Sequence, residues 1–309
     1  MTTDTPYIVG FGIACIDYIY VAPAAQPGGY SRVSEYMVQG GGLTGTAMVA
    51  AARLGAKARM LGRLGDDDIG DQVVQGLEAE GVDTGGLIRV PGGESLFSMI
   101  LVDTDTAERT IYGRVDTGTD CSTDLINLTA LEGADVLLLD HHWADGSRTA
   151  ARRARELGIP IVCDMFIRPE LMDLLAMCDH PVIPRKSAIK LSESADVCEA
   201  LAKIRSFGPK AAVVTCGADG AYYADESGQG HVEAFEVEAV DTTGAGDTFH
   251  GAFAVGLAHG WDLRKAVTFA SAVSAIKCTR VGGRTGIPSF EQAMEFLRER
   301  GATGFRPCE

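Results

Sequence analysis

The sequence lacks an excess of positive charge. Its 309 residues include 27 lysines and arginines against 42 aspartates and glutamates, which gives a formal net charge of −15. Proteins that bind nucleic acid use basic surfaces to displace the counterions of the phosphate backbone, so this balance argues against a nucleic-acid partner. An anionic ligand would need a local cationic pocket set within this negative overall field.

Signals for membranes and export are also missing. No apolar run approaches the length needed to cross a bilayer, so we expect no membrane partner. The start of the chain has neither the basic segment nor the apolar core of a secretory signal. The eight cysteines are scattered and include no CxxC pair of the kind that binds zinc or forms a redox dithiol. We therefore expect a protein of the reducing cytoplasm.

What the sequence does contain is an alternation of apolar strands and helices. Strands are expected at 7–13, 57–61, 135–140, 161–164, 181–183 and 211–215, and helices at 45–54, 69–80, 148–157, 169–177, 195–207, 245–258, 262–277 and 289–300. Continuous apolar strands alternating with helices predict an α/β protein with a largely parallel sheet covered on both faces. The length is that of one large domain, so we expect residues 1–309 to form a single unit.

Two stretches interrupt this alternation. Residues 17–38 mix tyrosine, valine, serine, proline and glycine, and residues 95–114 contain two strand-like runs separated by a polar turn. We expect these insertions to form a small separate β-sheet. A sheet of this kind can act as a lid over a site at the carboxyl edge of the main sheet.

The segment 240–247, with the sequence VDTTGAGD, is the most informative part of the chain. Gly244 and Gly246, separated by Ala245, allow a sharp turn that presents backbone N–H groups to a ligand. A helix follows at once, and its positive N-terminal end favours a phosphate. Asp247 lies in the first turn, where it could accept a proton from an alcohol. Helix capping and a simple turn are the alternative, but eight ordered residues favour phosphoryl transfer.

Other residues point to the same edge of the sheet. Asp17 follows the first strand and the glycines at 40–42 open a helix, although each could also serve an ordinary turn. Residues 213–221, a strand followed by a glycine loop, would suit a nucleotide phosphate. His142 follows the strand that ends at residue 140, where it is a substrate contact or a structural hydrogen-bonding group.

A competing pattern lies at residues 9–15. The glycines at 10 and 12 after an N-terminal strand resemble the start of a dinucleotide-binding fingerprint. Cys15 stands where the third glycine is required, and Asp17 comes too early to contact a ribose. The sequence therefore does not predict a dehydrogenase.

Over nearly its whole length the chain resembles the ribokinase-like (PfkB-type) carbohydrate kinases. The resemblance rests on the DTTGAGD segment, on Gly41-Gly42 with the helix closed by Gly55, on residues 62–70, and on residues 282–288. It implies a three-layer α/β/α sandwich with a small β-sheet lid. It also implies ATP and magnesium as cofactors, and frequently a homodimer that forms through the lids.

The resemblance implies roles for individual residues. Asp247 would take the proton from the substrate hydroxyl, while Gly244, Ala245 and Gly246 would form the anion hole. The substrate would be bound by Asp17, Gly41, Gly42, Thr46 and Asp247, with Arg114 and His142 beside it, and ATP by Thr215, Gly217, Gly220, Thr243, Gly244 and Gly246. Many members bind potassium, for which the corresponding positions are the oxygen atoms of Asp241 and Thr243 and the segment around 278–286.

Within the family, the likeness is strongest to the sulfofructose kinases, through Gly40 to Gly42 with Thr46 and through residues 143–146 and 277–288. It implies transfer of the γ-phosphoryl group of ATP to a primary hydroxyl of a ketose-type sugar, with 6-deoxy-6-sulfofructose as one candidate. A ribokinase, a fructokinase, a nucleoside kinase and a non-catalytic sugar or nucleotide sensor are the alternatives. Residues 185–188, Arg-Lys-Ser-Ala, stand where many relatives have an Asn-x-x-Glu motif that organises magnesium, so metal organisation should differ.

Overall fold

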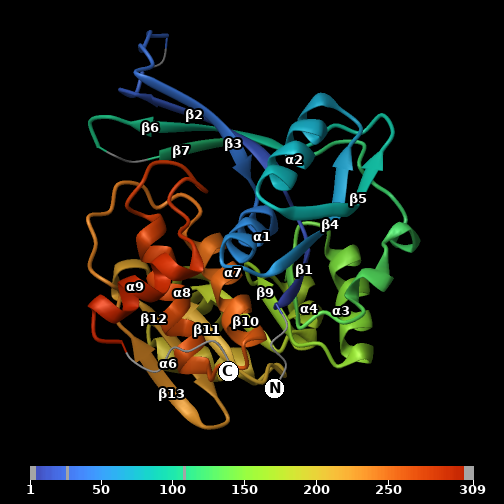
Figure 1. Cartoon of the computed structure of the whole chain (residues 1–309), viewed down its shortest axis with the longest axis vertical. Helices are drawn as coiled ribbons and strands as arrows, with labels where there is room; N and C mark the ends of the chain where they lie inside the picture. The colour runs from blue at the N-terminus through green and yellow to red at the C-terminus, as the bar shows by residue number, and fades with distance from the viewer. Residues whose placement is uncertain (1–4, 26–27, 107–108, 303–309) are drawn as a thin grey trace.

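The computed structural model describes residues 5–25, 28–106 and 109–302. Parts of the expected insertions, at 26–27 and 107–108, and both ends of the chain lie outside the described residues. The described chain forms a nine-stranded sheet, covered by helices, and a separate four-stranded sheet (Figure 1). The fold class predicted from the sequence is confirmed.

The large sheet has the strand order β13-β12-β11-β10-β9-β8-β1-β4-β5. The strands are β1 (Tyr7–Phe11), β4 (Lys57–Gly65), β5 (Val82–Val90), β8 (Val136–Asp140), β9 (Ile161–Asp164), β10 (His180–Pro184), β11 (Ala212–Thr215), β12 (Ala221–Asp225) and β13 (Gly228–Val232). From β11 to β5 every pairing is parallel, and the hairpin β12–β13 adds two antiparallel strands at one edge. The parallel strands therefore bring their carboxyl ends to a common edge, where such sheets bind ligands.

Helices cover both faces of the large sheet. They are α1 (Leu43–Arg53), α2 (Asp68–Ala79), α3 (Ala144–Leu157), α4 (Met172–Met177), α5 (Arg185–Ser192), α6 (Val197–Arg205), α7 (Ala245–Ala258), α8 (Leu263–Lys277) and α9 (Phe290–Glu299). Successive strand residues enter different cores: Ile8 packs with α1, α7 and α8, whereas Val9 packs with α3, α4 and α6. A strand buried on both faces requires the continuous apolar run found in the sequence. Across the described ranges, every helix is too short or too polar to span a membrane.

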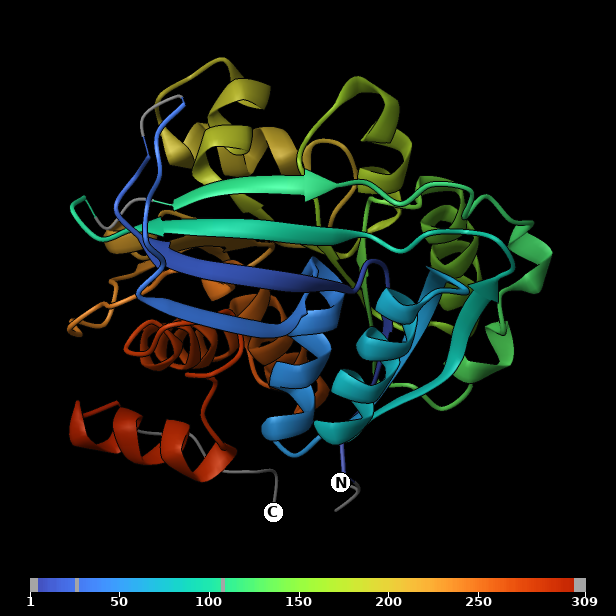
Figure 2. The same ribbon diagram turned by 90° about the horizontal axis from the view of Figure 1, so that it is seen from above.

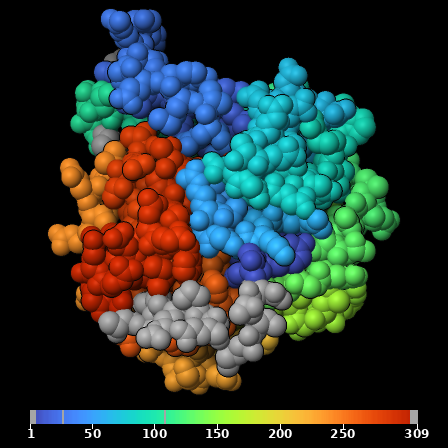
Figure 3. All heavy atoms as spheres, in the orientation of Figure 1, coloured from blue at the N-terminus to red at the C-terminus, as the bar shows by residue number. Residues whose placement is uncertain are grey.

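The small sheet comprises β2 (Cys15–Ala22), β3 (Glu35–Gly41), β6 (Phe97–Asp103) and β7 (Arg109–Arg114), in the order β3-β2-β6-β7. Seen from above, its strands cross over the large sheet and its helices (Figure 2). In the space-filling view, the blue atoms of the first strands lie next to the red C-terminal segment (Figure 3). Segments from opposite ends of the chain therefore meet beneath the small sheet.

Candidate active site

The glycine turn of the DTTGAGD segment leads directly into α7. Gly244 adopts a left-handed conformation with φ of 71°, and a Cβ atom there would lie 2.6 Å from the oxygen of Gly283, so this position requires glycine. A Cβ atom at Gly246 would meet no other atom within 4 Å. No side chain caps the helix. The N-terminus of α7 therefore opens into free space, where its N–H groups can bind an anion.

Asp247 lies half-buried in the first turn of α7. Removal from water raises the pKa of its carboxyl well above the usual range, and the negative charges of Asp164 and Asp17 raise it further. The guanidinium of Arg284 acts in the opposite direction. A carboxylate with a raised pKa is a stronger base once it is ionised.

Two further acids, whose charges act on Asp247, end the neighbouring strands β8 and β9. Asp140, fully buried at the end of β8, accepts hydrogen bonds from the backbone N–H of Ile13 at 2.7 Å and the hydroxyl of Thr44 at 2.7 Å. It therefore joins the β1–β2 connection to α1. Asp164, at the end of β9, lies 3.4 Å from Nδ1 of His250 on α7. Burial raises the pKa of Asp164.

A buried arginine organises the glycines at 40–42. Arg284 donates from Nη2 to the oxygen of Gly41 at 2.8 Å and from Nε to the hydroxyl of Thr46 at 3.3 Å. A Cβ atom at Gly40 would collide with this guanidinium, and one at Gly41 would collide with the carboxylate of Asp17. Burial lowers the pKa of Arg284 to about 10, so it still carries its charge at neutral pH. The structure thus brings the predicted residues Asp17, Gly41 and Thr46 together around a cation, while Gly42 packs against the backbone of Ile13 and Ala14.

The two faces of the small sheet have different surroundings. Asp17 pairs with Ser98, which pairs with Gly113, whereas Arg114 pairs with Phe97 one position further along. Side chains alternate between faces along a strand, so Arg114 lies on the face opposite Asp17. There it is ion-paired with Glu94 and lies over the ring of Phe97. The register therefore places Arg114 away from the face of Asp17, and its contact with the substrate stays a prediction.

Arg109, at the other end of β7, is a cation on the same face of the small sheet as Asp17. Its Nη1 donates to the hydroxyl of Thr243 at 3.0 Å. This contact joins the small sheet to the loop before the glycine turn. Gln39 pairs with Asp17 and lies on the same face. Its Nε2 is buried without a hydrogen-bond partner among the described residues, so it is available to a ligand.

A large cavity lies on the other side of the glycine turn. Its volume is about 530 Å³, and it is lined by Thr215, Gly217 and Gly220 on one side and by Ala245 and Gly246 on the other. The rest of its wall is mostly apolar and includes Ala234, Phe235, Phe249, Ala275 and Cys278. The cavity therefore unites four of the residues predicted to bind ATP, Thr215, Gly217, Gly220 and Gly246. Thr243 and Gly244, also predicted to bind ATP, are not among its lining residues, and Thr243 contacts Arg109 instead.

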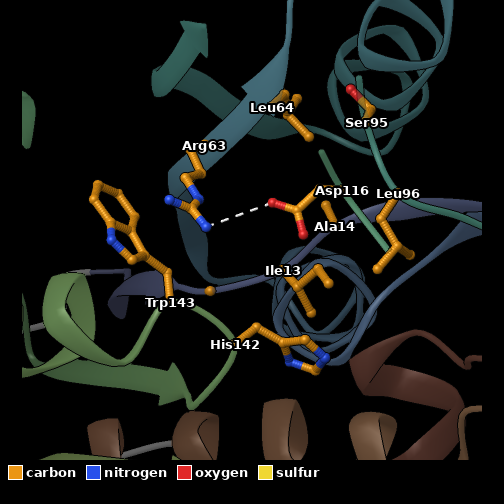
Figure 4. Close-up of a pocket in the computed structure, with 10 residues that line it drawn as sticks. Ile13, Ala14, Arg63, Leu64, Ser95, Leu96, Asp116, His142 and Trp143 are labelled. Atoms are coloured by element: carbon orange, nitrogen blue, oxygen red, sulfur yellow. Dashed lines mark ion pairs between the residues drawn. The ribbon is translucent and has the colours of Figure 1, made fainter. Parts of the chain in front are cut away.

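A second, small cavity of about 30 Å³ adjoins the β1–β2 connection. Figure 4 shows Arg63 and Asp116 pointing toward one another, with nitrogen and oxygen 3.5 Å apart, and Trp143 beside the guanidinium. His142 lines the same cavity and lies 3.5 Å from Asp140. Burial disfavours its charged form, but the hydrogen bond and charge of Asp140 prevail, so the pKa of His142 is raised.

The site offers few ligands to a divalent metal. Within the described ranges, no group of three or more His, Cys, Asp and Glu could hold a metal ion. Magnesium, however, is often bound by one or two carboxylates and the phosphates of a substrate. Asp164, close enough to Asp247 to raise its pKa, fits that role. Arg185, the first residue of the segment 185–188 in which we expect metal organisation to differ, begins α5 and is ion-paired with Asp219 at 2.9 Å.

Sequence reasoning missed several residues of the site. Arg284 and Lys277 lay within segments that carried the family resemblance, but nothing in those segments indicated that their charges are buried. The position of Arg284 directly after Gly282 and Gly283, in a chain with fewer cationic than acidic residues, is the signal that could have indicated a role in the site. Arg109 and Gln39 could have been found only with the strand register in hand.

Comparisons with known proteins agree with this architecture. The family model described as pfkB family carbohydrate kinase matches residues 5–289. The ribokinase of Schizosaccharomyces pombe is 31% identical over 283 residues, which cover 85% of this chain and 86% of that protein. The aminoimidazole riboside kinase of Salmonella typhimurium is 29% identical over 291 residues, or 86% of this chain and 90% of that protein. The crystal structure of ribokinase from Thermotoga maritima is 28% identical, with a TM-score of 0.82 over 95% of this chain and 99% of that one.

Proposed function

The chain belongs to the pfkB family of carbohydrate kinases, and on this premise we propose that it transfers the γ-phosphoryl group of ATP to a primary hydroxyl of a ketose-type sugar. One observation carries this proposal. The open N-terminus of α7, which can bind the transferred phosphoryl group, holds the half-buried carboxylate of Asp247 between the large cavity and the residues around Asp17.

The large cavity would bind ATP. Its apolar wall suits the adenine ring, and the glycine loop at 217–220, which lines the cavity, would lie beside the phosphates. The γ-phosphoryl group would then reach the N–H groups at 244–246, which oppose its negative charge in the transition state. Asp164 would hold magnesium, which when bound neutralises charge on the phosphate oxygens. Arg109, at the hydroxyl of Thr243, adds a positive charge from the small sheet.

Asp247 would act as the base. Its raised pKa suits proton abstraction from an alcohol. The charge of Asp17, on the sugar side, contributes to this raised pKa. Phosphoryl transfer depends mainly on positioning and charge stabilisation, so the carboxylate also orients the attacking hydroxyl. A positioned base contributes on the order of a hundredfold or more to turnover.

The sugar would lie beneath the small sheet. Asp17 and Gln39 offer polar groups to its hydroxyls, together with the backbone at Gly41 and Gly42 and the hydroxyl of Thr46. Its far end would approach His142 in the small cavity. Arg284 is a buried cation beside Gly41 in a chain of net charge −15, and it favours a ketose with an anionic substituent such as a sulfonate.

The small sheet would act as a lid and as a dimer interface. The contact of Arg109 with Thr243 supports closure over the site. The opposite face of the sheet exposes Tyr36, Val38, Met99 and Tyr112, an apolar group on one surface. Contiguous exposed apolar residues of this kind mark interaction surfaces, and a second copy of the chain would cover them through the same face.

A panel of acceptors tests the proposal. ATP-dependent ADP release should be measured with 6-deoxy-6-sulfofructose, fructose, ribose, hexose phosphates, keto-deoxy acids and nucleosides. The phosphorylated carbon should then be assigned by NMR. We expect a ketose to give the highest kcat/KM and Asp247→Asn to lower turnover about a hundredfold or more. Near-normal turnover of this variant would overturn the role of Asp247. A preference for nucleosides, or ATP binding without transfer to any acceptor, would overturn the proposed substrate class or the reaction.

A further inference from the structure

Lys277, the last residue of α8, is fully buried, with 0% of its surface exposed. Its Nζ donates a hydrogen bond to the main-chain oxygen of Asp241 at 2.8 Å. Lysine is almost never fully buried unless it is paired, because removing an ammonium from water is costly. The fold therefore places a paired amino group directly against the loop that leads to the glycine turn.

Two loops close around this ammonium. The carboxylate of Asp241 accepts hydrogen bonds from the backbone N–H groups of Thr243 and Gly282, each at 2.8 Å. The oxygen of Cys278 accepts from the N–H groups of Val240 at 2.8 Å and Asp241 at 3.1 Å. Burial lowers the pKa of Lys277 below its usual value, and the negative charge of Asp241 acts in the opposite direction. The ammonium thus lies where hydrogen bonds join the start of the DTTGAGD segment to the residues that follow α8.

The resemblance to carbohydrate kinases implies potassium at the oxygen atoms of this same loop, and the residues do not fit that ion. The oxygen of Asp241 already accepts from an ammonium, and both carboxylate oxygens of Asp241 already accept from backbone N–H groups. A potassium ion at the Asp241 oxygen would also lie next to a like charge held in a buried position, which is unfavourable at low dielectric.

We propose that Lys277 is a built-in monovalent cation, a positioning residue that fixes the Asp241 loop and with it the anion hole at 244–246, so that the protein does not require potassium. The inference deepens the proposed kinase function and rests on it for the meaning of the anion hole. The amino group is part of the chain, so its position beside the Asp241 oxygen does not depend on an ion bound from the medium. No exchange with the ionic composition of the medium is then needed to order the loop.

The first test uses the unmodified protein. Thermal melting and the affinity for a non-hydrolysable ATP analogue, measured by calorimetry, are compared in potassium, sodium and choline chloride at equal ionic strength and magnesium. We expect the analogue Kd to agree within about twofold and the melting temperature to stay unchanged. A saturable increase of the affinity for the ATP analogue or of the melting temperature with potassium, absent with choline, would overturn the proposal. Both readouts are independent of the sugar, so they decide even if the acceptor panel fails.

The second test removes the ammonium. Lys277→Ala leaves a cavity lined by the Asp241 oxygen, so we expect the analogue Kd to rise about tenfold in choline and to recover by at least half in potassium. Lys265→Ala, a partly exposed lysine on the same helix, is the matched control and should respond to neither salt. A Lys277→Ala protein with unchanged affinity, or a weakened one without any potassium response, would contradict the proposed role. Should this variant not fold, the salt comparison on the unmodified protein still decides.

Discussion

The guanidinium of Arg284 lies in the space that a Cβ atom at Gly40 would occupy, although the two residues are 244 positions apart in the sequence. Arg284 can therefore take this position only because residue 40 is glycine. Through this close approach Arg284 reaches the oxygen of Gly41 and the hydroxyl of Thr46. The glycine is required for packing against a side chain rather than for a special backbone angle. The relationship makes the wall of the proposed sugar site depend on the C-terminal part of the chain.

Gly40→Ala should therefore damage sugar binding. The added methyl group displaces Arg284 and breaks hydrogen bonds to a charged group, each worth about 1.5–3 kcal/mol. We expect the KM for the sugar to rise about tenfold or more, with the affinity for ATP unchanged. Steady-state kinetics with each substrate varied in turn checks this. Gly76→Ala on α2, where the methyl group meets nothing within 4 Å, is the control and should leave both constants unchanged. Equal kinetics for the two variants would contradict the prediction.

The parts of the site that the sequence predicts are those encoded locally. The helix expected at 245–258 coincides with α7, because a glycine turn followed by helical apolar spacing needs no distant partner. The glycine loop at 217–220 likewise lies on the large cavity. Strand β5 escaped prediction because two glycines and an aspartate weaken its pattern, and it is held in place by pairing with β4. Helix α5 also escaped prediction, because it is short and has no side-chain cap that would mark its start.

The parts that the sequence does not predict depend on register and burial. Arg109 and Arg114 end the same six-residue strand, and a shift of one residue would exchange their faces. Only the pairing of β6 with β7 decides which cation lies over the site. Arg284 and Lys277 are likewise charged residues that composition places on the surface, and tertiary packing buries both.

The two arginines of β7 form a matched pair for mutation. Arg109→Gln removes the cation that contacts Thr243, so we expect kcat to fall about tenfold, because a charged hydrogen bond near the phosphoryl group is lost. Arg114→Gln removes a partly exposed ion pair with Glu94, and such pairs contribute little. Its kcat should stay within about twofold of the unmodified protein. A larger loss for Arg114→Gln than for Arg109→Gln would reverse the assignment of the two faces.

Substitutions of the two glycines of the anion hole should have different effects, one on turnover and the other on stability. Gly246→Ala projects a methyl group into open space, so the protein should melt normally but lose turnover, because the methyl group occupies the phosphoryl position. Gly244→Ala forces a left-handed conformation and a contact with the oxygen of Gly283, which should cost roughly 1–3 kcal/mol of unfolding free energy. Denaturant unfolding and initial rates separate the two effects. Normal turnover of Gly246→Ala would show that this space is not used in the reaction.

The apolar face of the small sheet should control the oligomeric state. Met99 and Tyr112 are directly paired on that face and are 41% and 57% exposed. We expect the unmodified protein to sediment as a dimer, and the double variant Met99→Lys, Tyr112→Lys to sediment as a monomer, because buried unpaired charges are unfavourable. Leu157→Lys, an exposed apolar residue at the end of α3, serves as the control and should remain dimeric. A monomeric unmodified protein at micromolar concentration would contradict the proposed interface.

The pH dependence of activity should report the carboxylates around Asp247. Its pKa is raised by burial and by the charges of Asp164 and Asp17, so the carboxyl holds its proton to a higher pH than an ordinary aspartate with a pKa of about 3.9. Because the base must be ionised, kcat/KM should fall as the pH drops through this raised value. Asp164→Asn removes one of the charges, which lowers the pKa, so the acid limb should move to lower pH even though kcat decreases. Asp145→Asn, an exposed acid on α3, should leave the limb in place. An acid limb that stays fixed or moves to higher pH in Asp164→Asn would show that another group titrates in this range.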